Sequence, residues 1–163
     1  MKLLGAGILL CAGTMAGCFA AHRLERRAAL LRQLRHLLTV MMQELRNSLP
    51  LTADLLRLLA DMPAFGSLAF LQQTAAHPDF LPQRWSDSIN ADESLTPDIA
   101  AVLDTVGQTL GSTTLDGQLA ALQLCFDRLG ALQQYAESRA AAKGNLYRSM
   151  GILCALFFVI LLL

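Results

Sequence analysis

Two uncharged, apolar segments, one near each end, limit the folds that this chain can adopt. The first, residues 3–21, runs for nineteen positions without a charged side chain. A helix rises about 1.5 Å per residue, so roughly 20 apolar residues cross the hydrocarbon of a bilayer. We therefore predict an N-terminal transmembrane helix at residues 1–21. A cleaved secretory signal is the alternative, and it is disfavoured because the basic cluster follows the apolar run instead of preceding it.

The second segment, residues 149–163, is apolar on every side, which excludes an amphipathic helix of a soluble domain. It is short for a complete crossing of the bilayer. Tyr147 and Arg148, which precede it, suit the headgroup region and lengthen the anchor. We predict a second, short membrane helix at residues 149–163 that pairs with the first.

Two glycines of the first segment, Gly13 and Gly17, are four residues apart. Small residues at this spacing let two membrane helices approach each other closely. Glycine is also common in membrane helices in general. A packing role and simple composition therefore explain the spacing equally well.

Basic residues lie at the inner ends of both segments. Arg23, Arg26 and Arg27 follow the first segment, and the second is likewise preceded by basic residues. The positive-inside rule therefore places residues 22–148 in the cytoplasm and both termini outside. The simplest role of this arginine cluster is to set the topology and to contact the anionic headgroups of membrane lipid. A protein interface at these arginines is the alternative.

The charges of the whole chain balance, with thirteen Lys and Arg against thirteen Asp and Glu. The chain thus lacks the basic surplus of a nucleic-acid-binding protein. Its hydrophobic content of 54% also excludes a disordered, solvated chain. The charges are nevertheless unevenly placed, because residues 23–57 hold seven arginines and three acids, whereas residues 79–116 hold seven acids and one arginine. The simpler interpretation of this uneven charge is that the arginines set the topology and contact lipid. The more specific interpretation is that the acids form a surface that binds a basic partner.

The central segment, residues 22–148, has a helical pattern throughout. Its apolar residues recur at gaps of three and four, and no stretch alternates in the manner of a strand. Proline, glycine and capping residues divide the segment. The first expected helix covers residues 23–47; the second is capped by Ser48 or Thr52 and ends at Pro63. A third covers residues 65–75, and a short fourth helix lies around Trp85. The fifth runs from Thr96 and Pro97 to Gly111, and Thr114 caps the last one. We predict an all-α fold, a cytoplasmic bundle of about six helices between two membrane anchors.

The single tryptophan and the cysteines of the chain suggest packing more than chemistry. Trp85 either belongs to the core or forms an exposed contact with a partner. The cysteines form no C-x-x-C pair and the cytoplasm is reducing, so we expect free thiols that act as small apolar side chains. The four cysteines are Cys11, Cys18, Cys125 and Cys154.

Sequence motifs of catalysis or cofactor binding are missing from the chain. His22, His36 and His77 show no metal-binding spacing, and no phosphate-binding glycine loop or nucleophile elbow occurs. The adjacent acids Asp92 and Glu93 are better explained as solvated loop residues than as an acid–base pair. We predict a non-catalytic protein with no cofactor, no metal site and no small-molecule substrate.

The order of features along the chain is distinctive. After the first apolar run and the arginine cluster come Glu44-Leu45, Ser48-Leu49-Pro50-Leu51, Trp85, Val106-Gly107-Gln108-Thr109-Leu110-Gly111, Gln118, and Leu146-Tyr147-Arg148-Ser149-Met150-Gly151 ahead of the last run. In this order and spacing, essentially the whole chain resembles the stage III sporulation protein AB family. It departs from the family pattern at Thr114, where aspartate is usual, and at Val106, where leucine is usual. Threonine caps a helix nearly as well as aspartate, so the physical role is kept.

The resemblance implies a role that composition does not. The family is similar to the helical cytoplasmic domain of type II secretion F and type IV pilus inner-membrane platform proteins, and belongs to the channel complex between mother cell and forespore. It implies a scaffold in the mother-cell membrane around the forespore, with a secretion-type cytoplasmic ATPase and other membrane proteins of the channel as partners. The family offers no catalytic residues. Gly107, Gly111, Thr114 and Gln118 match its motif, and we interpret them as a tight turn followed by a helix cap.

A membrane-anchored signalling or sensor module is the alternative function. It is disfavoured because the predicted topology leaves almost nothing outside the membrane to sense a signal. The sequence leaves open whether the protein forms a homo-oligomer, what the channel carries, and which face of the bundle meets each partner.

Overall fold

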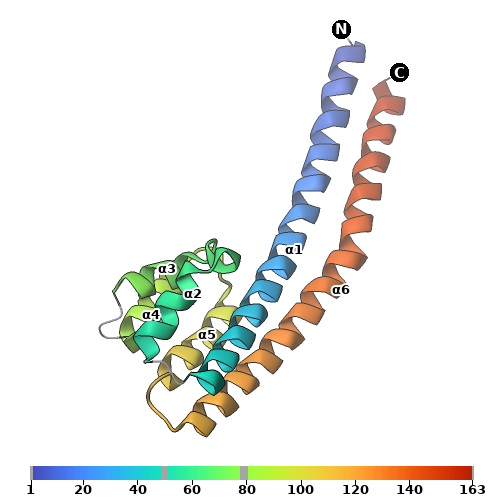
Figure 1. Cartoon of the computed structure of the whole chain (residues 1–163). Helices are drawn as coiled ribbons and strands as arrows, with labels where there is room; N and C mark the ends of the chain where they lie inside the picture. Colours follow the sequence, from blue (N-terminus) through green and yellow to red (C-terminus); the bar gives the residue numbers. More distant parts are fainter. Residues whose placement is uncertain (1, 49–50, 78–80, 163) are drawn as a thin grey trace. The chain divides into compact units, whose positions relative to one another are not determined.

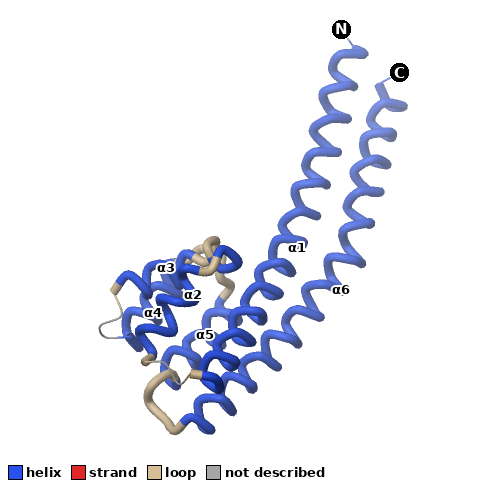
Figure 2. The backbone as a smooth tube through the Cα atoms, viewed as in Figure 1, coloured by secondary structure: helices blue, strands red, loops and turns tan. Residues whose placement is uncertain are grey.

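The computed structural model is helical throughout the residues that it describes, which are 2–48, 51–77 and 81–162 (Figure 1, Figure 2). This part of the chain contains six α-helices and one 3-10 helix, η1, and no strand. The all-α prediction is therefore confirmed. The elements are α1 (Lys2–Asn47), α2 (Thr52–Asp61), η1 (Pro63–Phe65), α3 (Ala69–Ala76), α4 (Leu81–Ala91), α5 (Pro97–Thr109) and α6 (Leu115–Leu162).

The chain forms two compact units. One unit, called the bundle below, is Leu31–Ala131 and contains the last part of α1, the first part of α6 and all elements between them. The other, called the end pair, combines Met1–Leu30 with Leu132–Leu163. The predicted boundaries at 21/22 and 148/149 fall inside α1 and α6, which continue through them without a break.

In the end pair, both the beginning of α1 and the end of α6 are continuous helix, coloured dark blue and red in Figure 1. Phe19 and Leu153 are exposed on these helices, with 69% and 66% of their surfaces accessible. Among the residues that the structure describes, no helix has a stretch long and apolar enough to cross a membrane. The packing around Gly13 and Gly17 lies outside the described part of the structure, as do the side chains of Cys11, Cys18 and Cys154.

Apolar burial holds the bundle together. The apolar residues of α1 that recur at gaps of three and four form one face of the helix, and this face is buried. Helices α5 and α6 contribute similar buried faces, called stripes below. On α2, Leu55, Leu56 and Leu59 are buried. Leu51 precedes this helix and Leu58 faces its outer side, so both are exposed. The buried stripes consist of Leu31, Leu34, Leu38, Met41 and Leu45 on α1, Ile99, Val102, Leu103 and Val106 on α5, and Leu122, Cys125 and Leu129 on α6.

The segment after Pro63 folds differently from the prediction. Residues 63–65 form η1, and α3 begins only at Ala69, so the helix predicted over residues 65–75 starts too early. Proline suits the first position of a helical turn, because the N–H that it lacks would be unpaired there in any case. Leu68 then takes an extended conformation, which separates the short turn from α3.

Side-chain capping is also weaker than predicted. Thr52 is the first residue of α2 and not its cap; the capping position is Leu51, and no side chain caps the helix there. The Ser48 hydroxyl instead donates to the carbonyl oxygen four residues earlier, 3.2 Å away. Serine and threonine readily form this local bond, which competes with capping. Thr96 does occupy the N-cap position of α5, but its side chain makes no capping hydrogen bond.

Two side chains of α1, Gln33 and Arg35, make polar contacts that help to position it within the bundle. Gln33 Nε2 donates to Ala64 O of η1 at 2.6 Å and to Ser67 Oγ at 2.8 Å. The guanidinium carbon of Arg35 lies 4.2 Å from the centre of the Phe126 ring on α6, in a cation–π contact. These contacts join α1 to the η1 region and to α6. They define the position of α1 more precisely than apolar packing alone would.

Candidate functional site

Gly107, the first of the four motif residues, lies inside α5 and not in the predicted turn. The helix continues to Thr109, so the turn prediction is wrong at this position. The glycine faces Trp85 of α4. A Cβ placed on it would lie 2.6 Å from Trp85 Cγ and still nearer to Cδ1. Only a residue without a side chain fits here, because the indole occupies that space.

Trp85 is fully buried, which decides in favour of the core alternative. Its Nε1 donates to Leu103 O of α5 at 2.7 Å, so the polar group of the buried indole is satisfied. Its ring meets Phe70 of α3 edge to face, with the ring centres 5.3 Å apart. Trp85 therefore joins α3, α4 and α5 through one side chain.

The other three motif residues lie in the connection between α5 and α6 and in the first turn of α6. Gly111 has a φ of +76°, in the left-handed region that favours glycine. Thr114 Oγ1 accepts a hydrogen bond from the Gly117 N–H at 3.4 Å. Gln118 Nε2 donates to Thr113 O at 2.9 Å. The structure thus places these three residues in a tight turn and at the start of the helix that follows.

Replacement of Gly111 with alanine is expected to lower the free energy of unfolding by about 1–2 kcal/mol, because a left-handed backbone is strained in residues with a Cβ. The added Cβ would also lie 2.9 Å from Thr52 Oγ1. Urea unfolding of the purified full-length protein, followed by far-ultraviolet circular dichroism, measures this loss. Gly111→Asn is the control, because asparagine tolerates this conformation better. Equal losses in the two variants would contradict the explanation by backbone strain.

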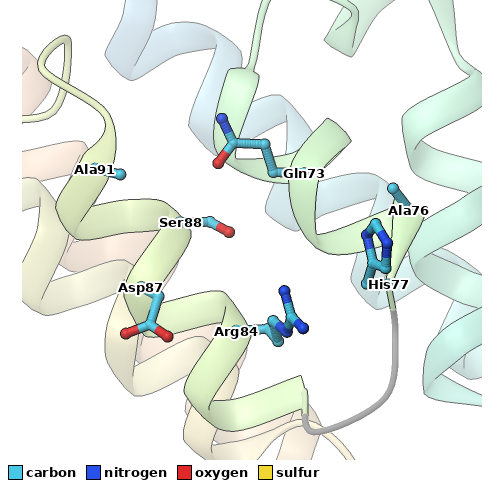
Figure 3. Close-up of a pocket in the computed structure, with 7 residues that line it drawn as sticks. All are labelled: Gln73, Ala76, His77, Arg84, Asp87, Ser88 and Ala91. Carbon is cyan, nitrogen blue, oxygen red and sulfur yellow. The ribbon is translucent and has the colours of Figure 1, made fainter.

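A polar groove of about 500 Å³ lies between α3 and α4 (Figure 3). Gln73, Arg84 and Ser88 project into the space between the two helices, whereas the carboxylate of Asp87 points away from it. Sequence reasoning missed this groove. Arg84 and Ser88 are one helical turn apart, which is a detectable signal, but nothing in the sequence pairs them with residues of α3. The lining residues are Gln73, Ala76, His77, Arg84, Asp87, Ser88 and Ala91.

A comparison with known protein families finds one family whose model matches this chain. The model of the family described as stage III sporulation protein AB matches residues 2–163. The chain belongs to the stage III sporulation protein AB family. The resemblance inferred from the order of motifs is therefore confirmed, and family membership implies a role in sporulation. Comparisons with curated proteins and with solved structures gave no match.

The acids of this family member do not gather at one point in the part of the chain that the structure describes. That part contains no group of three or more His, Cys, Asp or Glu able to hold a metal ion. Asp92 Oδ1 accepts hydrogen bonds from the N–H and the hydroxyl of Ser94, at 3.0 and 2.6 Å. It therefore stabilises the loop before α5. Asp104 Oδ2 accepts from Gln108 Nε2 at 2.7 Å, and both residues lie on α5.

The predicted arginine cluster lies on α1 in the end pair. Arg23 and Arg26 are exposed, and Arg27 is half-buried. His22 and Glu25, on the same stretch, form an exposed pair with 3.8 Å between Nδ1 and Oε2. The exposed guanidinium groups are available to water, lipid headgroups or a partner.

Cys125 of α6 is fully buried, and its thiol donates to Val102 O of α5 at 3.6 Å. Burial raises the pKa of this thiol above its ordinary value, and the charge of Arg128 lowers the same pKa by a smaller amount. The thiol consequently stays protonated at neutral pH and is a poor nucleophile. For Cys125, the predicted role of a small apolar side chain is confirmed.

The same burial makes stability depend on pH. Because the pKa of Cys125 is higher in the folded protein than in the unfolded chain, its contribution to stability is complete below the unfolded pKa and is lost as pH rises through the folded one. We expect the free energy of unfolding to fall more steeply at alkaline pH in the natural protein than in Cys125→Ala. Urea unfolding across a pH series measures both. Parallel pH profiles would show that another group causes the alkaline loss.

Proposed function

We propose that this protein is a non-catalytic membrane scaffold of the channel complex between mother cell and forespore, resembling a type II secretion F-type platform. The family match over residues 2–163 carries the proposal, because the family implies a sporulation role. The motif residues support a scaffold, since each contributes to folding: Gly107 to helix packing, Gly111 to a turn, and Thr114 and Gln118 to a helix start.

We further propose that residues 1–21 and 149–163 anchor the protein in the mother-cell membrane around the forespore, with the bundle facing the cytoplasm and both termini outside. The two uncharged segments and the basic residues at their inner ends support this placement. The exposure of Phe19 and Leu153 also suits helices that face lipid. The proposed partners are a secretion-type cytoplasmic ATPase and other membrane proteins of the channel.

The test of the scaffold is deletion of the gene in its native host, with membrane-stained cells followed through sporulation. We expect development to stop after engulfment. A full-length copy should restore spores, whereas a copy of residues 22–148 that accumulates to the same level should not. Normal sporulation of the deletion strain would overturn the proposal.

The arginine cluster offers a test of the anchoring that does not depend on spore counts. Reversal of charge in Arg26→Glu together with Arg27→Glu should reduce the membrane-bound fraction, because basic residues set the orientation of the adjacent helix. The matched control, Arg57→Glu with Arg128→Glu, makes the same charge change on exposed residues of the bundle. Cell fractionation and circular dichroism measure insertion and folding. Equal membrane fractions in both double variants would contradict the assigned role of the cluster.

A further inference from the structure

The groove between α3 and α4 contains a serine hydroxyl that binds no residue in the described part of the chain. Ser88 is only 8% exposed, and its hydroxyl makes no hydrogen bond to any residue that the structure describes. Several other hydroxyls on the bundle's helices bond to the carbonyl four residues earlier, as Thr74 does at 2.8 Å and Thr109 at 2.9 Å. The Ser88 Oγ is not among the side-chain oxygen and nitrogen atoms of the described residues that are both buried and unpartnered, so solvent in the groove reaches it. The Ser88 hydroxyl faces the groove, which is where a partner can reach it (Figure 3).

The groups around this hydroxyl are mainly hydrogen-bond donors. Arg84 supplies a guanidinium with five N–H groups, and the amide of Gln73 carries two N–H donors beside one acceptor oxygen. The imidazole of His77 offers at least one N–H in either of its charge states. Arg84 and Asp87 lie three residues apart on α4, but no ion pair joins them within the described residues, and Asp87 is turned away (Figure 3). The centre of the groove therefore suits a carboxylate or another oxyanion.

The size of the groove distinguishes a peptide from a free anion. At about 500 Å³ it falls within the usual range of ligand sites. A water molecule occupies only about 30 Å³ of liquid, so a single small anion would leave most of the groove filled with solvent. A peptide segment would also use the rest of the lining, where Ala76 and Ala91 offer apolar contact.

We infer that this groove binds an acidic segment of a partner protein, with one Asp or Glu carboxylate held by Arg84, Gln73 and Ser88. The inference deepens the proposed scaffold function and rests on it, because it names the chemistry by which the bundle recognises a partner. Its test requires no sporulating cell. A negative binding result therefore leaves the deletion phenotype, and the scaffold proposal, standing.

The experiment measures the fluorescence anisotropy of a labelled hexaglutamate peptide titrated with purified full-length protein in detergent, at low salt so that charges are not screened. Hexaglutamine of the same length is the uncharged comparison. We expect hexaglutamate alone to bind. Arg84→Gln should weaken its binding about tenfold, the effect expected when a charge-assisted contact is lost. Arg128→Gln, which removes an exposed arginine of α6, should leave binding unchanged.

Ser88→Ala distinguishes a binding role from a structural one. If the hydroxyl serves a ligand, alanine should weaken hexaglutamate binding several-fold while the free energy of unfolding stays the same or rises, because alanine favours the helix more than serine does. A loss of stability in Ser88→Ala with unchanged binding would overturn the assignment of this residue.

Three results would overturn the inference as a whole. Hexaglutamate and hexaglutamine could bind equally, or not at all. Arg84→Gln could behave like Arg128→Gln. Inorganic phosphate could displace the peptide at concentrations where chloride of equal ionic strength does not, which would identify a site for small anions in place of a peptide site.

Discussion

Replacement of Gly107 with alanine is expected to destabilise the bundle by about 3 kcal/mol or more, at the upper end of what overpacking of a core costs. The new methyl group would lie 2.6 Å from Trp85 Cγ, and the indole is fully buried with its N–H bound to Leu103 O. Neither ring rotation nor a helix shift can relieve this contact without loss of other core packing. Urea unfolding of the full-length protein, followed by the fluorescence of its single tryptophan, measures the change.

Gly130 provides the control for this experiment. It also lies inside a helix, α6, but a Cβ placed on it would come no closer than 3.5 Å to its nearest neighbour, Arg35. Alanine should therefore stabilise the protein here, by roughly 0.5–1 kcal/mol, because glycine is a poor helix former. The two substitutions are chemically identical and are expected to have opposite signs. A mild effect of Gly107→Ala would show that α4 and α5 can move apart at low cost.

Replacement of Trp85 with alanine is expected to cost about 3–5 kcal/mol, the usual loss for a large aromatic side chain in a core. The substitution removes the edge-to-face contact with Phe70 and the hydrogen bond from the indole N–H to Leu103 O. Circular dichroism must report unfolding here, because the variant contains no tryptophan. A loss below about 1 kcal/mol would place the ring at the surface and contradict its burial.

The two substitutions should also be coupled. In a Trp85→Ala background the space that the indole occupied is empty, so Gly107→Ala should then cost little or even stabilise the protein. Residues in direct contact typically show interaction free energies of about 0.5–3 kcal/mol in such double-mutant cycles. Additive losses would mean that Gly107→Ala acts through the α5 backbone and not through contact with Trp85.

The helices of the bundle were largely predictable from sequence, because the signals that define them are local. The gaps of three and four on α1 mark the face that is buried, and Pro97 and Gly111 lie at the ends of α5 as their backbone preferences require. The errors occurred where local signals compete. Pro63 was expected only to end a helix, yet it also begins the turn of η1. Ser48 bonds to its own helix instead of capping the next.

The groove was not predictable, because its chemistry depends on two helices at once. Periodicity identifies Trp85 and Ile89 as the inner face of α4 but carries no information on the neighbour of Ser88. A serine inside a helix ordinarily bonds to its own backbone or to solvent. Only the packing of α3 beside α4 places Gln73 and His77 near it.

The helical fold, most of the helix ends and the family could be predicted from the residues alone, since each follows from local periodicity or from the order of short motifs. The roles of the motif residues became clear only from the packing of the helices. Gly107 was predicted to form a turn, and it is a contact surface for an indole 22 positions earlier in the chain. The physical reason is that a glycine permits both an unusual backbone conformation and a close approach, and the distinction depends on a neighbour that the sequence does not specify.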